Sequence, residues 1–105
     1  METPRRYLLV IQVPIESVGD FDRLIEAEER IEALLLGLGQ VDGHDAGSGE
    51  GNIFIRTDAP QIALQKALPC LDEKVRDRAR AAYRELDGEQ YTLLWPPGLT
   101  EFRVT

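Results

Sequence analysis

The fold is decided by residues 40–57, which read Gln40-Val-Asp-Gly-His-Asp-Ala-Gly-Ser-Gly-Glu-Gly-Asn-Ile-Phe-Ile-Arg-Thr57. A polar segment, 40–46, is followed by three glycines (at 47, 49 and 51) and then by an apolar segment, 52–57. Glycine is favoured where a backbone needs a positive φ, as in tight β-hairpin turns. The stretch therefore predicts a hairpin that joins a charged strand, suited to a sheet edge, to a buried strand.

Hydrophobic spacing outside this hairpin predicts a further strand and two helices. Residues 6–13 are apolar at alternating positions on both faces, as expected of a central strand. A helix is predicted over 21–36, with Asp20 as its N-cap. Its expected core stripe is Phe21, Leu24, Ile25, Ile31, Leu34 and Leu35. A second helix is expected after Asp58 as cap, with Pro60 in its first turn and an inner face of Ile62, Ala63, Ala67, Leu68 and Leu71.

Residues 74–86 fit two interpretations. As a helix, they would place Val75, Ala79, Ala82 and Leu86 on one side, and Ala and Arg favour that state. As a strand, 79–86 would pair with 90–95 across Asp87-Gly88, a strong hairpin signal. The remaining sheet edge needs a partner, so we slightly favour the hairpin.

The order β-α-β-β-α-β, with a possible extra C-terminal hairpin strand, predicts a single α+β domain over residues 1–105. It resembles the ferredoxin-like arrangement, an antiparallel sheet with two helices on one face. The segment from Asp42 to Ile55 also resembles the hairpin of small uncharacterised bacterial proteins with an Asp-Gly…Gly-Ser-Gly-Glu…Asn-Ile-Phe-Ile pattern. That likeness supports the fold and implies no activity.

Composition narrows the classes of partner. The net charge of −7 and pI near 4.6 argue against binding to nucleic acid. Cys70 is the single cysteine, which favours the reducing cytoplasm, and no apolar run is long enough to span a membrane. Charge is also uneven: residues 16–58 hold eleven acids and three bases (−8), whereas residues 74–84 hold five bases and one acid (+4).

One face of the predicted sheet has no helix to cover it. Leu8, Val10, Phe54 and Leu94 are expected to point away from both helices. An apolar patch of this kind must be covered, or it becomes an interaction site. Three covers are open: the tail 99–105 with its apolar residues, a second copy of the chain, or another protein.

The hairpin offers a second candidate site, made of Asp42, His44, Asp45, Ser48 and Glu50. Its glycines lack the lysine of a phosphate-binding loop, and a single histidine among carboxylates is a poor metal site, so we favour a structural turn. No nucleophile with an adjacent base is apparent, and we expect neither catalysis nor a cofactor.

The sequence as a whole predicts a small non-catalytic binding protein, homodimeric through the open sheet face in its simplest form. One alternative is an acidic inhibitor or immunity-type protein that neutralises a basic protein partner. Another is a small-ligand or metal site at the hairpin 42–52.

Overall fold

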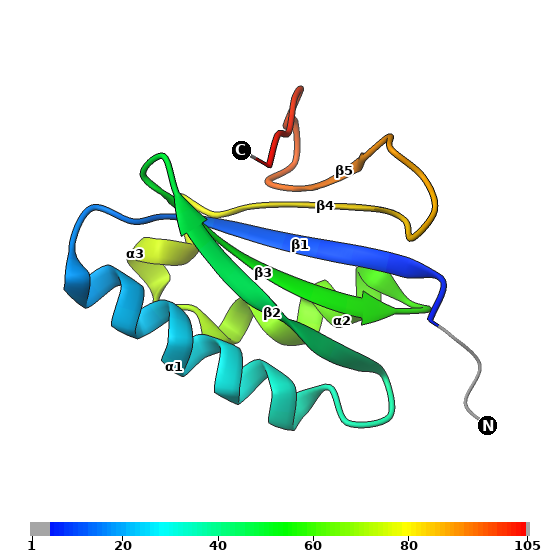
Figure 1. Ribbon diagram of the computed structural model, residues 1–105, viewed down its shortest axis with the longest axis horizontal. Helices are drawn as coiled ribbons and strands as arrows, with labels where there is room; N and C mark the ends of the chain where they lie inside the picture. The colour runs from blue at the N-terminus through cyan, green and yellow to red at the C-terminus, as the bar shows by residue number, and fades with distance from the viewer. Residues whose placement is uncertain (1–4, 105) are drawn as a thin grey trace.

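The computed structural model describes residues 5–104, which form an α+β fold around a five-stranded antiparallel sheet (Figure 1). The strands are β1 (Tyr7–Pro14), β2 (Gly39–Gly47), β3 (Glu50–Thr57), β4 (Arg80–Glu85) and β5 (Thr92–Trp95), in the order β2-β3-β1-β4-β5. The helices are α1 (Val18–Leu34), α2 (Pro60–Ala67) and α3 (Glu73–Arg76), with a 3-10 turn, η1, at Leu68–Cys70. All three α-helices lie on one side of the sheet, and the C-terminal segment lies on the other (Figure 1).

Strand β1 is central, as its two apolar faces predict. It pairs with β3 on one side and β4 on the other, and residues 8–13 are all buried. Leu9, Ile11 and Val13 face the helices and join the main core. The other members of that core come from α1, β3, the α2–η1 region and the start of β4: Leu24, Ala27, Ile31, Leu35, Ile53, Ile55, Ala63, Leu64, Ala67, Cys70, Leu71, Ala79 and Ala81.

Helix α1 starts earlier than the sequence suggested. Ser17 is the N-cap, and its hydroxyl accepts a hydrogen bond from the Asp20 amide at 3.2 Å. The prediction of Asp20 as N-cap is therefore wrong: its carboxylate lies in the first turn, where it accepts from the Glu16 amide and pairs with Arg23. Leu34, expected in the core stripe, is 57% exposed because the buried stripe passes through its neighbour Leu35.

The hairpin is confirmed, and its connection is a two-residue turn. Gly47 pairs with Glu50, and the two residues between them have positive φ, 56° at Ser48 and 80° at Gly49. Two consecutive positive φ values define a type I′ turn, whose twist matches that of the flanking strands. The strand β2 is the sheet edge, as predicted, and its register shifts between Val41 and His44, around Gly43 at φ 107°.

Helix α2 has Pro60 in its first turn, as predicted, but Asp58 does not cap it. Ala59 is the N-cap residue and has no side-chain cap bond. The Thr57 hydroxyl accepts from the Ala59 amide and donates to the Leu38 carbonyl, while Asp58 binds the Arg5 guanidinium and the Arg6 amide. Ile62 is half exposed rather than buried.

Both interpretations of residues 74–86 were partly right. A short helix, α3, covers the beginning, and β4 then pairs with β5 as the favoured hairpin. The tight Asp87-Gly88 connection is wrong, since residues 86–91 form a longer loop. The Arg84 guanidinium holds this loop by donating to the carbonyl oxygens of Glu85, Leu86 and Gly88.

The face of β5 also differs from the prediction. Ala81 pairs with Trp95 but Ala82 pairs with Leu93, so one extra residue, Leu94, is inserted in β5. Such a bulge reverses the alternation of side chains along the strand. Leu94 consequently packs against the helix-side core, and Leu93 shares the opposite face with Ala82 and Val10.

Ser48 offers a test of the turn. A non-glycine residue at positive φ is strained, whereas asparagine tolerates that conformation. We expect Ser48→Asn to raise the free energy of unfolding by about 0.5 kcal/mol and Ser48→Val to lower it by about 1 kcal/mol or more. Urea denaturation measures both, and equal stability of the two variants would contradict the type I′ assignment.

Candidate functional site

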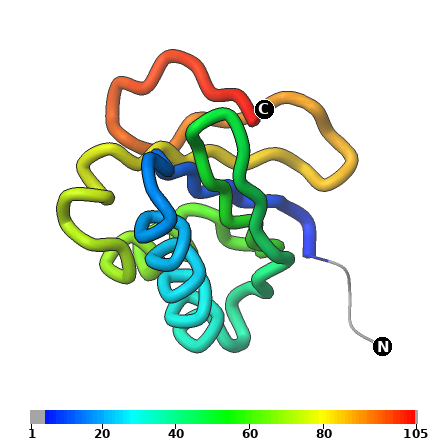
Figure 2. Tube along the Cα trace, turned by 60° about the vertical axis from the view of Figure 1, so that its left-hand side comes forward, coloured from blue at the N-terminus to red at the C-terminus, as the bar shows by residue number. Residues whose placement is uncertain are grey.

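The sheet face opposite the helices, called here the tail face, is covered by the C-terminal segment. Val10 and Ala82 are fully buried and Leu8 is nearly so, while Phe54 is half-buried. Residues 96–104 run over this face as an irregular segment (Figures 1 and 2). Its apolar side chains, Leu99, Phe102 and Val104, are half-buried. Of the three covers that the sequence left open, the structure has the first, the chain's own tail, which is described as far as Val104. Thr105 lies outside the described residues.

A chain of polar side chains fastens this segment to the sheet. The Asn52 amide donates to the Asp45 carboxylate at 2.8 Å, and the Gln12 amide donates to the Asn52 side-chain oxygen at 3.1 Å. The same Gln12 nitrogen donates to the Arg103 carbonyl oxygen at 2.7 Å. Gln12 and Asn52 are almost completely buried, and an unmet amide at such a position costs about 1–3 kcal/mol. The Arg103 carbonyl therefore fixes the position of the tail.

These polar contacts were not predicted from the sequence. Their only local signal is Gln12, the one amide within an otherwise apolar strand, Tyr7–Pro14. The partners of Gln12 come from β3 and from a position 91 residues later in the chain. Spacing along the sequence gives no indication of either contact.

The five hairpin residues predicted as one site are directed to different places. Asp42 pairs with Arg56 at 3.1 Å, and Asp45 belongs to the polar chain on the tail face. Ser48 and Glu50 lie at the turn, where they border an open hollow of about 580 Å³. His44 points to the opposite, helix-bearing side. The fold does not gather these residues into one site.

His44 joins the edge strand to helix α1. Its ring packs edge-on against Phe21, with centroids 5.7 Å apart, and its Nδ1 lies 2.9 Å from a Glu28 carboxylate oxygen. This position explains why a histidine occurs in a charged edge strand: it is a packing and hydrogen-bonding contact between β2 and α1. Within residues 5–104 no three potential metal-ligating side chains of His, Cys, Asp or Glu lie close enough together to hold an ion.

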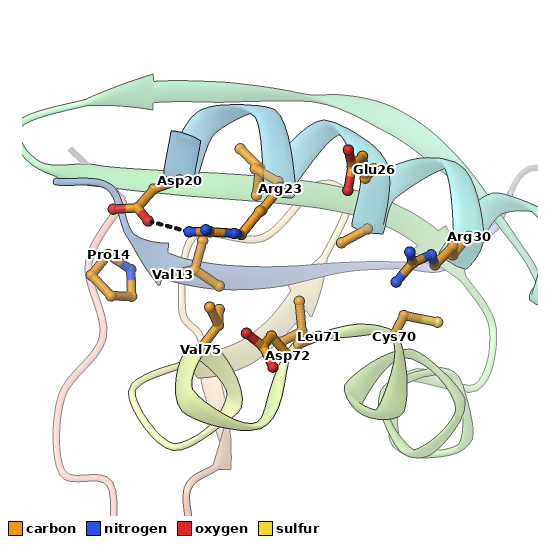
Figure 3. A pocket seen from close by; sticks show the side chains of 12 residues that line it. Val13, Pro14, Asp20, Arg23, Glu26, Arg30, Cys70, Leu71, Asp72 and Val75 are labelled. Atoms are coloured by element: carbon orange, nitrogen blue, oxygen red, sulfur yellow. Dashed lines mark hydrogen bonds and ion pairs between the residues drawn. The ribbon is translucent and has the colours of Figure 1, made fainter. Parts of the chain in front are cut away.

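A cleft of about 180 Å³ lies between α1 and the η1–α3 segment (Figure 3). Its apolar walls are supplied by both sides and by the end of β1. They comprise Val13, Pro14, Leu24, Ala27, Leu71 and Val75. Charged side chains rim it: Asp20, Arg23, Glu26 and Arg30 from α1, and Asp72 from the opposite wall. Cys70 completes the lining.

The charged side chains around this cleft differ in whether they form ion pairs. Arg23 is held by Asp20 at 3.2 Å (Figure 3). Arg30 and Asp72 form no ion pair or side-chain hydrogen bond with any residue between 5 and 104, and in Figure 3 both reach into the cleft. Burial raises the pKa of the Cys70 thiol, and the positive charge of Arg30 opposes that rise. Cys70 is thus kept as a neutral thiol beside a free guanidinium.

The outward side of α1 carries a second feature, called here the acidic stripe: Asp22, Glu29 and Glu32. At 100° per residue Asp22 and Glu29 lie opposite the buried residues Leu24 and Ile31, and Glu32 lies next to Glu29 on the flank of the helix. All three are exposed, and none forms an ion pair with the described residues. The neighbouring Glu28 differs, because it is turned toward β2 and His44.

Three of the five basic side chains in segment 74–84 bind other groups of the protein, whereas Lys74 and Arg80 are exposed and have no partner among the described residues. The Arg76 guanidinium donates to the carbonyl oxygens of Leu68 and Leu71, which close the η1 turn. Arg84 holds the β4–β5 loop, and Arg78 pairs with Glu16 at 2.6 Å. Contacts within the protein therefore explain most of the basic charge in segment 74–84. The carboxylates of the acidic stripe have no such contacts among the described residues.

Comparison with models of protein families, with curated proteins and with solved structures gave no match to this chain. None of the helices within the described range, 5–104, is long and apolar enough to cross a membrane.

Truncation tests the role of the tail. Removing residues 99–105 uncovers Val10 and deprives the buried Gln12 amide of an acceptor, so we expect the free energy of unfolding to fall by roughly 2–4 kcal/mol. The newly exposed face should also make the shortened chain self-associate in analytical ultracentrifugation, with the full chain remaining a monomer. Thr100→Ala, at an exposed tail position, is the control. A full chain that is already a dimer would contradict this account.

Replacing His44 tests its packing role. We expect His44→Ala to lower the free energy of unfolding by about 1 kcal/mol, since it removes both the ring contact and the hydrogen bond to Glu28. Gln40→Ala, at an exposed position of the same strand, should have little effect. Melting curves with and without zinc complete the test: a zinc-dependent rise in the native chain that is lost in His44→Ala would instead support a metal site at the hairpin.

Proposed function

We propose that this protein acts by binding a basic protein partner through the acidic stripe of α1. The observation that carries the proposal is the contrast between the two charged regions. The arginines of segment 74–84 are largely held by carbonyl oxygens and by Glu16, whereas Asp22, Glu29 and Glu32 are exposed without cationic partners in the described chain. Carboxylates left free in this way attract a partner of opposite charge and steer its approach.

The rigidity of the stripe supports this function. It lies on a helix of 17 residues with a Ser17 cap, and the buried side of that helix packs on the sheet. His44 and Glu28 fix one flank of the helix to β2. Three carboxylates in fixed relative positions give a partner a defined charge pattern, which a mobile acidic tail does not. An inhibitor or immunity-type role, carried out in the cytoplasm, is the form of this function that the sequence suggests.

The homodimer through the tail face, which the sequence favoured, is untested, and we place it second. It would require residues 99–104 to leave Leu8, Val10 and Phe54, and the Gln12 amide would have to find another acceptor. The acidic stripe needs no such rearrangement. For this reason we place partner binding at α1 first.

We further propose that β1 to β4 form a ferredoxin-like unit and that β5 is an addition at its edge. The order β2-β3-β1-β4 and the helical connections after β1 and β3 support this arrangement. In it, α1 is the first crossover helix, so its outward side is free of the sheet by construction.

Charge neutralisation tests the function. Immobilised protein should retain a basic partner from host extract at low ionic strength and release it at high ionic strength. The triple variant Asp22→Asn, Glu29→Gln, Glu32→Gln should retain at least tenfold less of it. A matched triple, Asp87→Asn, Glu89→Gln, Glu101→Gln, makes the same change of charge at exposed positions elsewhere and should bind as the native chain does. Equal losses in both triples would contradict a defined site.

A further inference from the structure

The cleft between α1 and the η1–α3 segment combines an apolar interior with two opposite charges that have no partner. Arg30 reaches in from the α1 wall and Asp72 from the opposite wall (Figure 3). Neither is paired within residues 5–104, although the nearby Arg23 is paired with Asp20. Both side chains are exposed, and the exposed Glu26, which also lines the cleft, has no partner within residues 5–104 either. A ligand that carries both a positive and a negative group can pair with Arg30 and Asp72 at once.

The helix geometry places Arg30 above the cleft. Arg23 and Arg30 are seven residues apart on α1 and therefore lie on the same side of the helix, above the cleft. Arg23 has a carboxylate at i−3, Asp20, within 3.2 Å. Arg30 lies instead over Cys70, where its charge acts on the thiol. The thiol does not pair with the guanidinium, and Glu26, one turn earlier on α1, lines the cleft without forming an ion pair with Arg30. The Arg30 guanidinium is therefore available to an anionic group.

We propose that this cleft binds a small aliphatic amino acid in its zwitterionic form, with the carboxylate on Arg30, the ammonium group on Asp72 and the side chain against Leu71 and Val75. A guanidinium offers two parallel donors that match a carboxylate, and an aspartate accepts from an ammonium group. The hydrocarbon part of the ligand meets the apolar wall. The cleft, at about 180 Å³, is below the range of drug-sized pockets, which restricts the ligand to a small molecule.

This site is separate from the acidic stripe. Asp22, Glu29 and Glu32 do not line the cleft. Variants of the two sites therefore test two independent statements, and failure of one leaves the other intact.

L-leucine and two analogues provide the test. Isopentylamine is leucine without its carboxylate, and isocaproate is leucine without its amino group. Titration followed by amide chemical shifts in NMR should show saturable binding of leucine, with changes centred on Ala27, Leu71 and Val75. Each analogue should bind at least about tenfold more weakly, since each forfeits one charge-assisted contact.

Variants assign the two charges. Arg30→Gln should weaken leucine binding at least about tenfold and make leucine and isopentylamine equivalent. Asp72→Asn should do the same for leucine and isocaproate. Arg80→Gln and Asp87→Asn make identical chemical changes at exposed positions outside the cleft and should leave binding unchanged. The spectra themselves report whether each variant is folded.

The proposal is overturned if neither leucine nor L-valine shifts the cleft amides at the limit of solubility. It is also overturned if leucine and both analogues bind equally, because apolar contact alone would then explain binding. Cys70 gives a second readout: leucine in the cleft should slow alkylation of the thiol in the native chain but not in Arg30→Gln.

Discussion

Burial of β1 on both faces is the constraint on which the rest of the structure depends. A strand with apolar side chains on both sides cannot face water, so each side of the sheet needs its own cover. Three helices cover the side of β1 that carries Leu9, Ile11 and Val13. The tail supplies the other cover, on the side of Leu8 and Val10, and its Arg103 carbonyl oxygen accepts from the Gln12 amide, which also donates to Asn52. The protein is thus a three-layer molecule whose third layer has no secondary structure.

This arrangement decides which surfaces are free to interact. The tail face is used for internal packing, so we look for the interaction surface on α1 instead. The buried side of that helix packs on the sheet, one flank contacts His44, the other borders the cleft, and the outward side carries the acidic stripe. Binding of a basic partner and binding of a small zwitterion would use different sides of the same rigid element.

Some predictions succeeded because they depend on local physics. Gly49, next to Ser48, favours the positive φ of the turn. Ile53 and Ile55 point to the core side of β3 and Phe54 to the other, as alternation along a strand requires. Others failed where neighbours in space decide the outcome. Leu94 lies on the helix side of the sheet, and not on the predicted side, because β5 contains a bulge. His44 lies apart from the other predicted hairpin residues because it contacts Phe21 and Glu28 of α1 on the helix side of its strand. The candidate cleft was not foreseen, since Arg30 lies on α1, Asp72 lies between η1 and α3, and neither has a distinctive local pattern.

The sequence by itself determined the α+β class, the central position of β1, the hairpin 40–57 and the acidic character of α1. These follow from periodicity, turn chemistry and charge, which act over a few residues. Only the tertiary structure decided that residues 99–104 cover the tail face, that the basic segment is held by carbonyl oxygens, and that Arg30 and Asp72 face a common cleft. Those outcomes depend on which distant groups can satisfy a buried amide, a free carbonyl or a charge, and that is fixed only when the layers pack together.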